Sequence, residues 1–163
     1  FEADPFLCHM MLLSNALNDN KVNIVTTAIA DTNKIAQFNI ANRGRASNFL
    51  TEHKGRSQAG GTRFSFSVPT MTLDFMLETF SPPTFLKIDV EGAEIDLLLG
   101  AKNVLLLHKP VIVLSLHPQY IEKMNQSLSD LRSYLEEVNF RCLTIDGKDN
   151  NDFHQKECIL LPN

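Results

Sequence analysis

Acidic and imidazole side chains directly follow two apolar segments of this 163-residue chain. Asp89 and Glu91 come after the segment at 84–88, and His117 comes after the segment at 111–116. A carboxylate can bind an ammonium group or take a proton from a hydroxyl, and an imidazole with a pKa of about 6.5 suits general-base catalysis. The three side chains could also hold a divalent metal ion through oxygen and nitrogen atoms. We predict catalytic roles for all three and assign no metal to them.

Two further acidic residues stand near the N-terminus. Glu2 follows a short extended start of the chain, and Asp31 follows a β-branched segment at 22–29. An acid after the second strand of a nucleotide-binding sheet accepts hydrogen bonds from both hydroxyls of a ribose. Glu2 therefore predicts a cofactor that contains ribose, such as a nicotinamide dinucleotide or S-adenosylmethionine, without naming the reaction.

The elements that would position these side chains are predicted from hydrophobic periodicity. Strand patterns occur at 22–29, 35–40, 64–68, 84–89, 111–116, 140–145 and 158–161, and helical patterns occur at 5–18, 71–80, 93–107 and 127–138. This alternation predicts an α/β fold with one sheet, mostly parallel and with an antiparallel C-terminal strand. Ligands of such sheets bind at the carboxyl ends of the strands, where the acidic residues and the histidine stand.

The first predicted helix carries an apolar stripe. Phe6, Met10, Leu13 and Leu17 recur at the spacing of one helix face. A stripe of this kind is typical of a helix that packs against the core. We therefore expect these four side chains to be buried.

The segment at 42–63 differs in composition from the rest of the chain. It contains four of the seven glycines, and five basic residues against one acidic residue give it a charge of +4. Polar, glycine-rich segments of this length form long loops. Two interpretations remain open: a solvated loop, or a flap that closes over an anionic or hydroxylated substrate. Phe49 is its single large aromatic residue, so a stacking platform for nucleic acid is not expected.

The composition is that of an ordinary globular domain. Hydrophobic residues make up 44% of the chain and charged residues 21%, and 15 basic against 19 acidic side chains give a net charge of −4. A broad nucleic-acid-binding face normally makes a protein basic, so no nucleic-acid partner is expected. No uninterrupted apolar run exceeds four residues, which argues against a membrane span. We predict a single domain over residues 1–163.

The cysteines show no spacing that is typical of zinc or redox sites. Cys8, Cys142 and Cys158 are odd in number and far apart. Reduced thiols of this kind indicate a cytoplasmic protein.

Five sequence blocks together resemble the FkbM-type methyltransferase family. They stand at 1–5 (FEADP), 28–31 (AIAD), 68–74 (VPTMTLD), 87–94 (KIDVEGAE) and 109–113 (KPVIV). Their order and spacing match from residue 1 to about residue 161, and KIDVEGAE is the most specific block. The resemblance implies a Rossmann-like class I sheet and S-adenosylmethionine-dependent methyl transfer. The acceptor in this family is usually an oxygen of a sugar, lipid or secondary metabolite.

The resemblance also implies cofactor contacts for single residues. Glu2 would bind the ribose of S-adenosylmethionine, and Thr27, Ala28 and Asp31 would lie beside its adenine. Asp89 would lie near the methionine end and the transferred methyl group. It is therefore predicted both as a cofactor-binding and as a catalytic residue.

The resemblance says less about the residues around the methyl acceptor than about those around the cofactor. Glu91 and His117 would border the acceptor, a small molecule, glycan or lipid. Either Asp89 or His117 would take the proton of its hydroxyl. Ser115 stands where the family often has an acid, which weakens a role for that position.

The family's first strand and glycine-rich loop would precede Glu2, and they are absent from this sequence. We therefore expect a fragment of a longer protein that is a poor enzyme in isolation. The alternative is a truncated or degenerate methyltransferase domain that acts as a non-catalytic interaction module. A short-chain dehydrogenase is disfavoured, because neither Tyr120 nor Tyr134 is followed four residues later by lysine.

Overall fold

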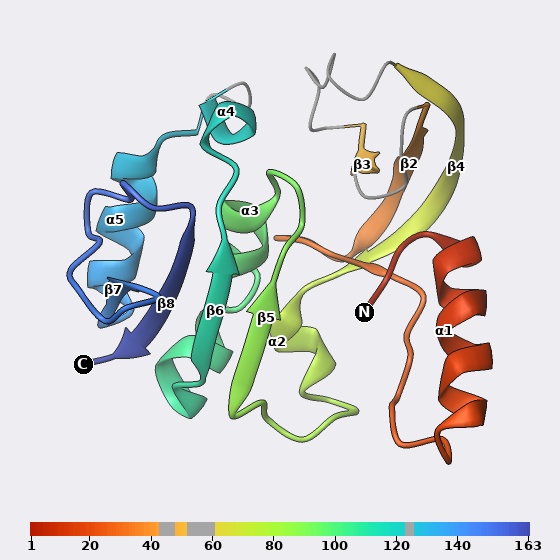
Figure 1. Ribbon diagram of the computed structural model, residues 1–163, viewed down its shortest axis with the longest axis horizontal. Helices are drawn as coiled ribbons and strands as arrows, with labels where there is room; N and C mark the ends of the chain where they lie inside the picture. Colours follow the sequence, from red (N-terminus) through yellow and green to blue (C-terminus); the bar gives the residue numbers. More distant parts are fainter. Residues whose placement is uncertain (43–47, 52–60, 123–125) are drawn as a thin grey trace.

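The computed structural model describes residues 1–42, 48–51, 61–122 and 126–163. Its strands form two four-stranded sheets, with strand orders β1-β4-β2-β3 and β5-β6-β8-β7. Figure 1 shows the two sheets side by side, with α1 beside the first and α5 beside the second. The prediction of an α/β fold is confirmed.

The first sheet is built mainly from a long antiparallel pair. Its strands are β1 (Ala28–Ile29), β2 (Lys34–Ala41), β3 (Phe49–Leu50) and β4 (Thr62–Met71). β2 pairs antiparallel with both β3 and β4, and β1 pairs parallel with β4. Phe38, Ile40 and Val68 point to one side of this sheet and form a small buried cluster there.

The second sheet carries the larger hydrophobic core. Its strands are β5 (Phe85–Ile88), β6 (Val111–Ser115), β7 (Phe140–Thr144) and β8 (Glu157–Pro162). β5 and β6 are parallel, and β8 runs antiparallel to both β6 and β7, which confirms the predicted antiparallel C-terminal strand. Ile112, Leu114 and Leu160 are fully buried. Complete burial of one such side chain stabilises a fold by about 1.5–3 kcal/mol.

Short helices connect the strands. They are α1 (Pro5–Leu17), α2 (Leu73–Met76), α3 (Glu94–Leu99), the π-helical turn η3 (Val104–His108), α4 (Pro118–Ile121) and α5 (Leu128–Glu137). Asp4 caps α1, Thr72 caps α2, and Ser127 with Asp130 forms a capping box at α5. These side-chain oxygens satisfy amides that lack a partner within the helix. No helix in the described ranges is both long enough and apolar enough to cross a membrane.

The helix predicted at 93–107 is interrupted at Gly100. α3 ends at Leu99, and a β-carbon at position 100 would lie 2.1 Å from the carbonyl oxygen of Ala30. Glycine allows this approach because it has no β-carbon. Ala30 directly follows β1, so the contact joins the first sheet to the helix that packs on the second.

The prediction of one mostly parallel sheet is not confirmed. Among the described strands, β1 pairs parallel with β4 and β5 with β6, whereas the remaining pairings are antiparallel. The segments at 35–40 and 64–68 pair directly with each other, and they do so in antiparallel orientation. The segment at 22–29 contributes only β1 and a parallel bridge between Thr26 and Glu2. Both sheets are therefore mixed.

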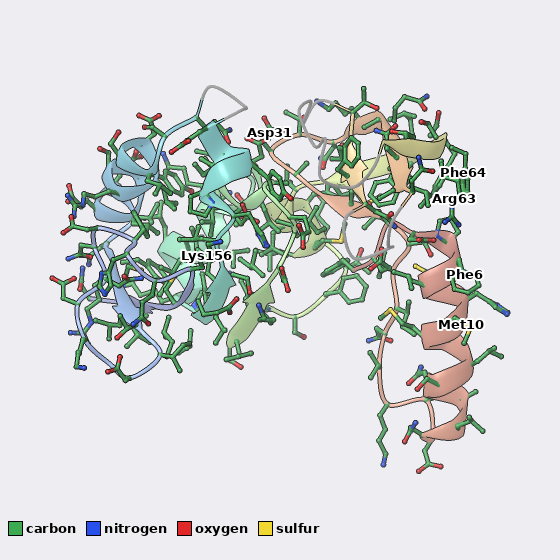
Figure 2. The ribbon with its side chains drawn as sticks, turned by 45° about the horizontal axis from the view of Figure 1, so that its top comes forward. Phe6, Met10, Asp31, Arg63, Phe64 and Lys156 are labelled. Atoms are coloured by element: carbon green, nitrogen blue, oxygen red, sulfur yellow. The ribbon has the colours of Figure 1, made fainter. Side chains whose placement is uncertain are left out.

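The apolar stripe of α1 is exposed, so the prediction that it is buried is wrong. The exposed fractions of Phe6, Met10, Leu13 and Leu17 are 51%, 48%, 50% and 87%. Figure 2 shows Phe6 and Met10 projecting from α1 away from the sheets. Cys8 is buried, and its thiol donates to the carbonyl of Glu2 at 3.1 Å. The periodicity predicts the helix correctly, but it does not determine which face is covered.

Most of the segment at 42–63 lies outside the described residues, and so does the predicted loop or flap. Its described part at 48–51 contains β3. Asn48 donates a hydrogen bond from Nδ2 to Oδ2 of Asp4 at 2.9 Å. This bond connects the start of β3 to the N-cap of α1.

Candidate functional site

A hollow of about 460 Å³ lies between the N-terminal segment, the first sheet and β5. Apolar side chains such as Phe1, Leu50 and Leu97 form part of its wall. It is also lined by five of the seven predicted site residues: Glu2, Thr27, Ala28, Asp89 and Glu91. The volume lies within the range of about 300–1,000 Å³ that is typical of small-molecule sites.

Backbone hydrogen bonds hold Glu2 and Thr27 together at this hollow. The Glu2 amide donates to the carbonyl of Val25, and the Thr27 amide donates to the carbonyl of Glu2, both at 3.1 Å. Thr27 is buried, and its hydroxyl donates to the Pro69 carbonyl at 2.9 Å. Oε1 of Glu2 accepts from the Asp4 amide at 2.7 Å. A carboxylate has about four acceptor positions, so Glu2 can receive further hydroxyl groups.

A turn with unusual backbone geometry follows β5 and carries two acidic residues. β5 ends at Ile88, so Asp89 and Glu91 belong to the turn and not to the strand. Glu91 has a φ of 53°, in the left-handed region that non-glycine residues rarely adopt, and Gly92 follows with a φ of 102°. Strained backbone of this kind is frequent at functional sites.

His117 follows β6 and faces both acidic residues. Its Nε2 lies 3.6 Å from Oε1 of Glu91 and 4.0 Å from Oδ1 of Asp89, and its Nδ1 lies 2.8 Å from Oε1 of Glu94. The hydrogen bond to Glu94 raises the pKa of His117 above its usual value. Burial opposes this increase, and the charges of the three carboxylates add to it.

Glu94 is a site residue that the sequence analysis missed. Its side chain is fully buried, and Oε1 also accepts a hydrogen bond from the Gly92 amide at 2.7 Å. Oε2 has no hydrogen-bond partner among the described residues. In the sequence, Glu94 resembles an ordinary acid in a first helical turn, where the helix dipole favours negative charge. Its place between the apolar residues Ala93 and Ile95 was the available signal.

A second polar network places a cation beside Asp89. Lys87 donates from Nζ to Oγ of Ser115, which in turn donates to Oε2 of Glu157 at 2.9 Å. Nζ of Lys87 also lies 3.9 Å from Oδ2 of Asp89. Sheet pairing brings Lys87, Ser115 and Glu157 together, because they belong to β5, β6 and β8.

Asp31 and His117 do not line the hollow. Asp31 is exposed beyond β1, and its Oδ1 accepts from the Thr32 hydroxyl at 3.1 Å (Figure 2). His117 contacts Asp89 and Glu91, which do line the hollow. The histidine therefore reaches the hollow only through its contacts with these two carboxylates.

A family model described as the methyltransferase FkbM domain matches residues 1–142. The chain belongs to the FkbM methyltransferase family. All seven predicted site residues fall within the matched range. Membership of the FkbM family confirms the resemblance seen in the sequence and supports a methyltransferase function.

A solved FkbM methyltransferase, from Methylobacillus flagellatus KT, has a similar fold. The TM-score is 0.55 at 14% sequence identity. The match covers 98% of this chain and 35% of the other, so this FkbM chain spans about a third of that protein. At this identity the likeness concerns the fold alone. A comparison with curated proteins finds no match.

Proposed function

We propose that this FkbM-family chain forms the binding site of an S-adenosylmethionine-dependent O-methyltransferase. The hollow lined by Glu2, Asp89 and Glu91 is the observation that supports this most strongly. Its carboxylates suit a cofactor that carries hydroxyl groups at one end and an ammonium group at the other. The proposed acceptor is a hydroxyl group of a small molecule, glycan or lipid.

The proposed cofactor contacts use groups at this hollow. Glu2 accepts hydrogen bonds from the ribose hydroxyls, and Thr27 and Ala28 border the adenine. Asp89 receives the ammonium group of the methionine part. Asp31 is proposed beside the adenine as well, although it lies outside the lining.

The proposed mechanism is an in-line displacement. S-adenosylmethionine, when bound, supplies a methyl group that its positively charged sulfur already activates. The protein then holds the acceptor hydroxyl and removes its proton. We propose Asp89 or His117 as the proton acceptor, with Glu91 bordering the acceptor. Transfer of the methyl group to the acceptor oxygen would leave S-adenosylhomocysteine, while Asp89 or His117 would hold the proton of the hydroxyl.

Calorimetric titration of S-adenosylhomocysteine into the chain, with a metal chelator present, tests this proposal. We expect one binding site per chain. Glu2→Gln should weaken binding about tenfold or more, because hydrogen bonds to a charged carboxylate are stronger than those to an amide. Glu78→Gln changes an exposed acid outside the hollow and is the matched control. Absence of binding to the folded chain would overturn the proposal.

The exposed stripe of α1 favours a second candidate function. Phe6, Met10, Leu13 and Leu17 expose apolar side chains along one helix. Contiguous apolar surface of this kind often binds a protein partner. A folded chain that does not bind S-adenosylhomocysteine would support a non-catalytic interaction module instead.

We also propose a cytoplasmic location. Cys8, Cys142 and Cys158 are all unpaired and buried. Thiols remain reduced in the cytosol, whereas oxidising compartments favour disulfides. Cell fractionation with an antibody against the chain tests this location.

A further inference from the structure

We propose that Asp89, Glu91 and His117 form a binding site for one divalent metal ion, such as Mn²⁺. One ligand atom from each residue lies within 4.8 Å of the other two. Two carboxylate oxygens and one imidazole nitrogen suit such an ion, because carboxylates favour Mg²⁺ and Mn²⁺ and imidazole favours the transition metals. The site connects the turn after β5 to the end of β6, two strands that pair in parallel.

The three ligand groups converge without hydrogen-bonding to one another. Nε2 of His117 lies 3.6 Å from Oε1 of Glu91 and 4.0 Å from Oδ1 of Asp89. Both distances exceed the roughly 2.7–3.2 Å of a direct N–H···O hydrogen bond. A metal ion holds oxygen and nitrogen ligands at about 2.0–2.2 Å, so two ligands of one ion lie about 3–4 Å apart. The two separations from Nε2 of His117 fit ligands of a shared ion.

A buried carboxylate supports the histidine at its other nitrogen. Oε1 of Glu94 lies 2.8 Å from Nδ1 of His117, and the Glu94 side chain is 0% exposed. When Nδ1 donates to a carboxylate, the neutral ring presents the lone pair of Nε2 to Asp89 and Glu91. Histidine ligands of metal sites commonly have this carboxylate partner, which fixes the tautomer and orients the ring.

The charges around the cluster also favour a cation. Oε2 of Glu94 is buried and has no hydrogen-bond partner among the described residues. Burial of a carboxylate is costly unless positive charge lies nearby. Lys87 lies 3.9 Å from Asp89, but its ammonium group is also engaged by Ser115. With His117 neutral as a ligand, an ion held by it and by the two acidic residues would supply the positive charge close to Glu94.

The site is open enough to share its ion with another molecule. The side chains of Asp89 and Glu91 are 54% and 26% exposed, and both line the hollow. Three protein ligands with open coordination positions are typical of catalytic metal centres. An ion here would bind the acceptor hydroxyl and lower its pKa. Asp89 and His117 would then hold the ion, and the proton of the hydroxyl would pass to solvent water instead of to either side chain. That role rests on the proposed methyl transfer, whereas metal binding itself does not.

Titration of Mn²⁺ into the chelator-treated and desalted chain tests the metal site. Electron paramagnetic resonance of the free ion and calorimetry should both give one bound Mn²⁺ per chain. Asp89→Asn and Glu91→Gln should each weaken binding about tenfold or more, because a neutral amide attracts the cation less than a carboxylate does. Asp19→Asn removes a distant, exposed carboxylate and should leave the affinity unchanged. Circular dichroism confirms that each variant is folded.

Proton magnetic resonance adds a readout that does not depend on a substitution. Bound Mn²⁺ should broaden the ring signals of His117 at ratios that leave those of His9 and His154 sharp. Absence of binding, or equal affinity in wild type, Asp89→Asn and Glu91→Gln, would overturn the metal site. The titration of S-adenosylhomocysteine uses a chelator, so cofactor binding and metal binding can each fail independently.

Discussion

Nδ1 of His117 and Oε1 of Glu94 lie 2.8 Å apart although the two residues are separated by 23 positions in the chain. The same carboxylate oxygen accepts the amide of Gly92 at 2.7 Å. Glu94 begins α3, and His117 follows β6. One buried carboxylate therefore holds the turn that carries Asp89 and Glu91 and also orients the histidine that faces them.

Removal of this carboxylate should destabilise the fold. We expect Glu94→Ala to lower the free energy of unfolding by about 3 kcal/mol, because His117 and the Gly92 amide lose a buried partner. A double-mutant cycle with His117→Ala should give a coupling energy of about 1–3 kcal/mol. Urea denaturation of the two single variants and the double variant measures both quantities. A coupling energy near zero would show that the two side chains do not interact.

Gly100→Ala should also destabilise the fold. Alanine is normally favoured over glycine at a helical position by about 0.5–1 kcal/mol. Here a β-carbon would lie 2.1 Å from the Ala30 carbonyl oxygen, so we expect a loss of about 1–3 kcal/mol instead. Thermal unfolding measures the difference, and Asn103→Ala serves as a nearby control at an exposed position. A stabilised Gly100→Ala variant would contradict the close packing of α3 on the segment after β1.

Asp74 should prove structural rather than catalytic, although it belongs to one of the blocks that indicate the family. Its two carboxylate oxygens accept the amides of Asn103 and Val104, each at 2.9 Å, at the start of η3. Asp74→Ala should therefore cost about 1–2 kcal/mol of stability, as expected for a lost helix cap. Affinity for S-adenosylhomocysteine, measured below the unfolding temperature, should stay within a factor of about two. A much larger loss of affinity would assign Asp74 to the binding site.

Lys87→Gln should strengthen binding of Mn²⁺ by about two- to fivefold. The Lys87 ammonium group lies 3.9 Å from Asp89, and two unit charges about 4 Å apart interact by about 1 kcal/mol in water. Its removal leaves more of the Asp89 charge for the ion. Lys102→Gln, which breaks an ion pair with Glu137, should leave Mn²⁺ affinity unchanged. Calorimetry compares the two variants, and equal effects would argue against a local contribution of Lys87.

Tyr134 should make the stability of the fold depend on alkaline pH. Its hydroxyl donates to the Leu98 carbonyl at 2.8 Å. Burial raises the pKa of Tyr134 to about 12, with smaller contributions from the charges of Asp74 and Glu137. The unfolded side chain ionises at about pH 10, so the folded state binds this proton more tightly. The stabilisation is therefore complete below about pH 10 and is lost as the pH rises toward about 12.

Denaturation in urea across this pH range tests the role of Tyr134. The free energy of unfolding of the wild-type chain should fall more steeply above pH 10 than that of Tyr134→Phe, which has no group to ionise. Parallel pH profiles for the two proteins would contradict the raised pKa. Ultraviolet absorbance of the tyrosinate provides an independent measure of the ionisation.

Much of the local structure could be predicted from the sequence. The segment predicted as a strand at 84–89 and the amphipathic segment predicted as a helix at 127–138 correspond to β5 and α5. These segments carry their own signals, because periodicity and capping residues act over a few positions. The helix predicted at 93–107 ends at Leu99, and the close approach of Gly100 to Ala30, about 70 positions earlier, has no local signal.

The candidate site was predicted in part. Glu2, Asp89 and Glu91 line one hollow, as expected for acids that follow strands. Glu94 and Lys87 were missed, because the importance of each depends on burial or on a neighbour in another strand. Burial also depends on tertiary contacts in α1, where the apolar stripe that begins at Phe6 has helical spacing but is exposed.

The sequence by itself determined the chemistry available to this protein and the family to which it belongs. The run from Lys87 to Glu94 contains the strand end, the acidic residues and the glycine within eight consecutive positions. The tertiary structure alone decided which of these groups meet. The parallel register of β5 and β6 brings His117 within 2.8 Å of Glu94 and within 4.0 Å of Glu91 and Asp89, because strand pairing brings residues that are far apart in sequence close together in space.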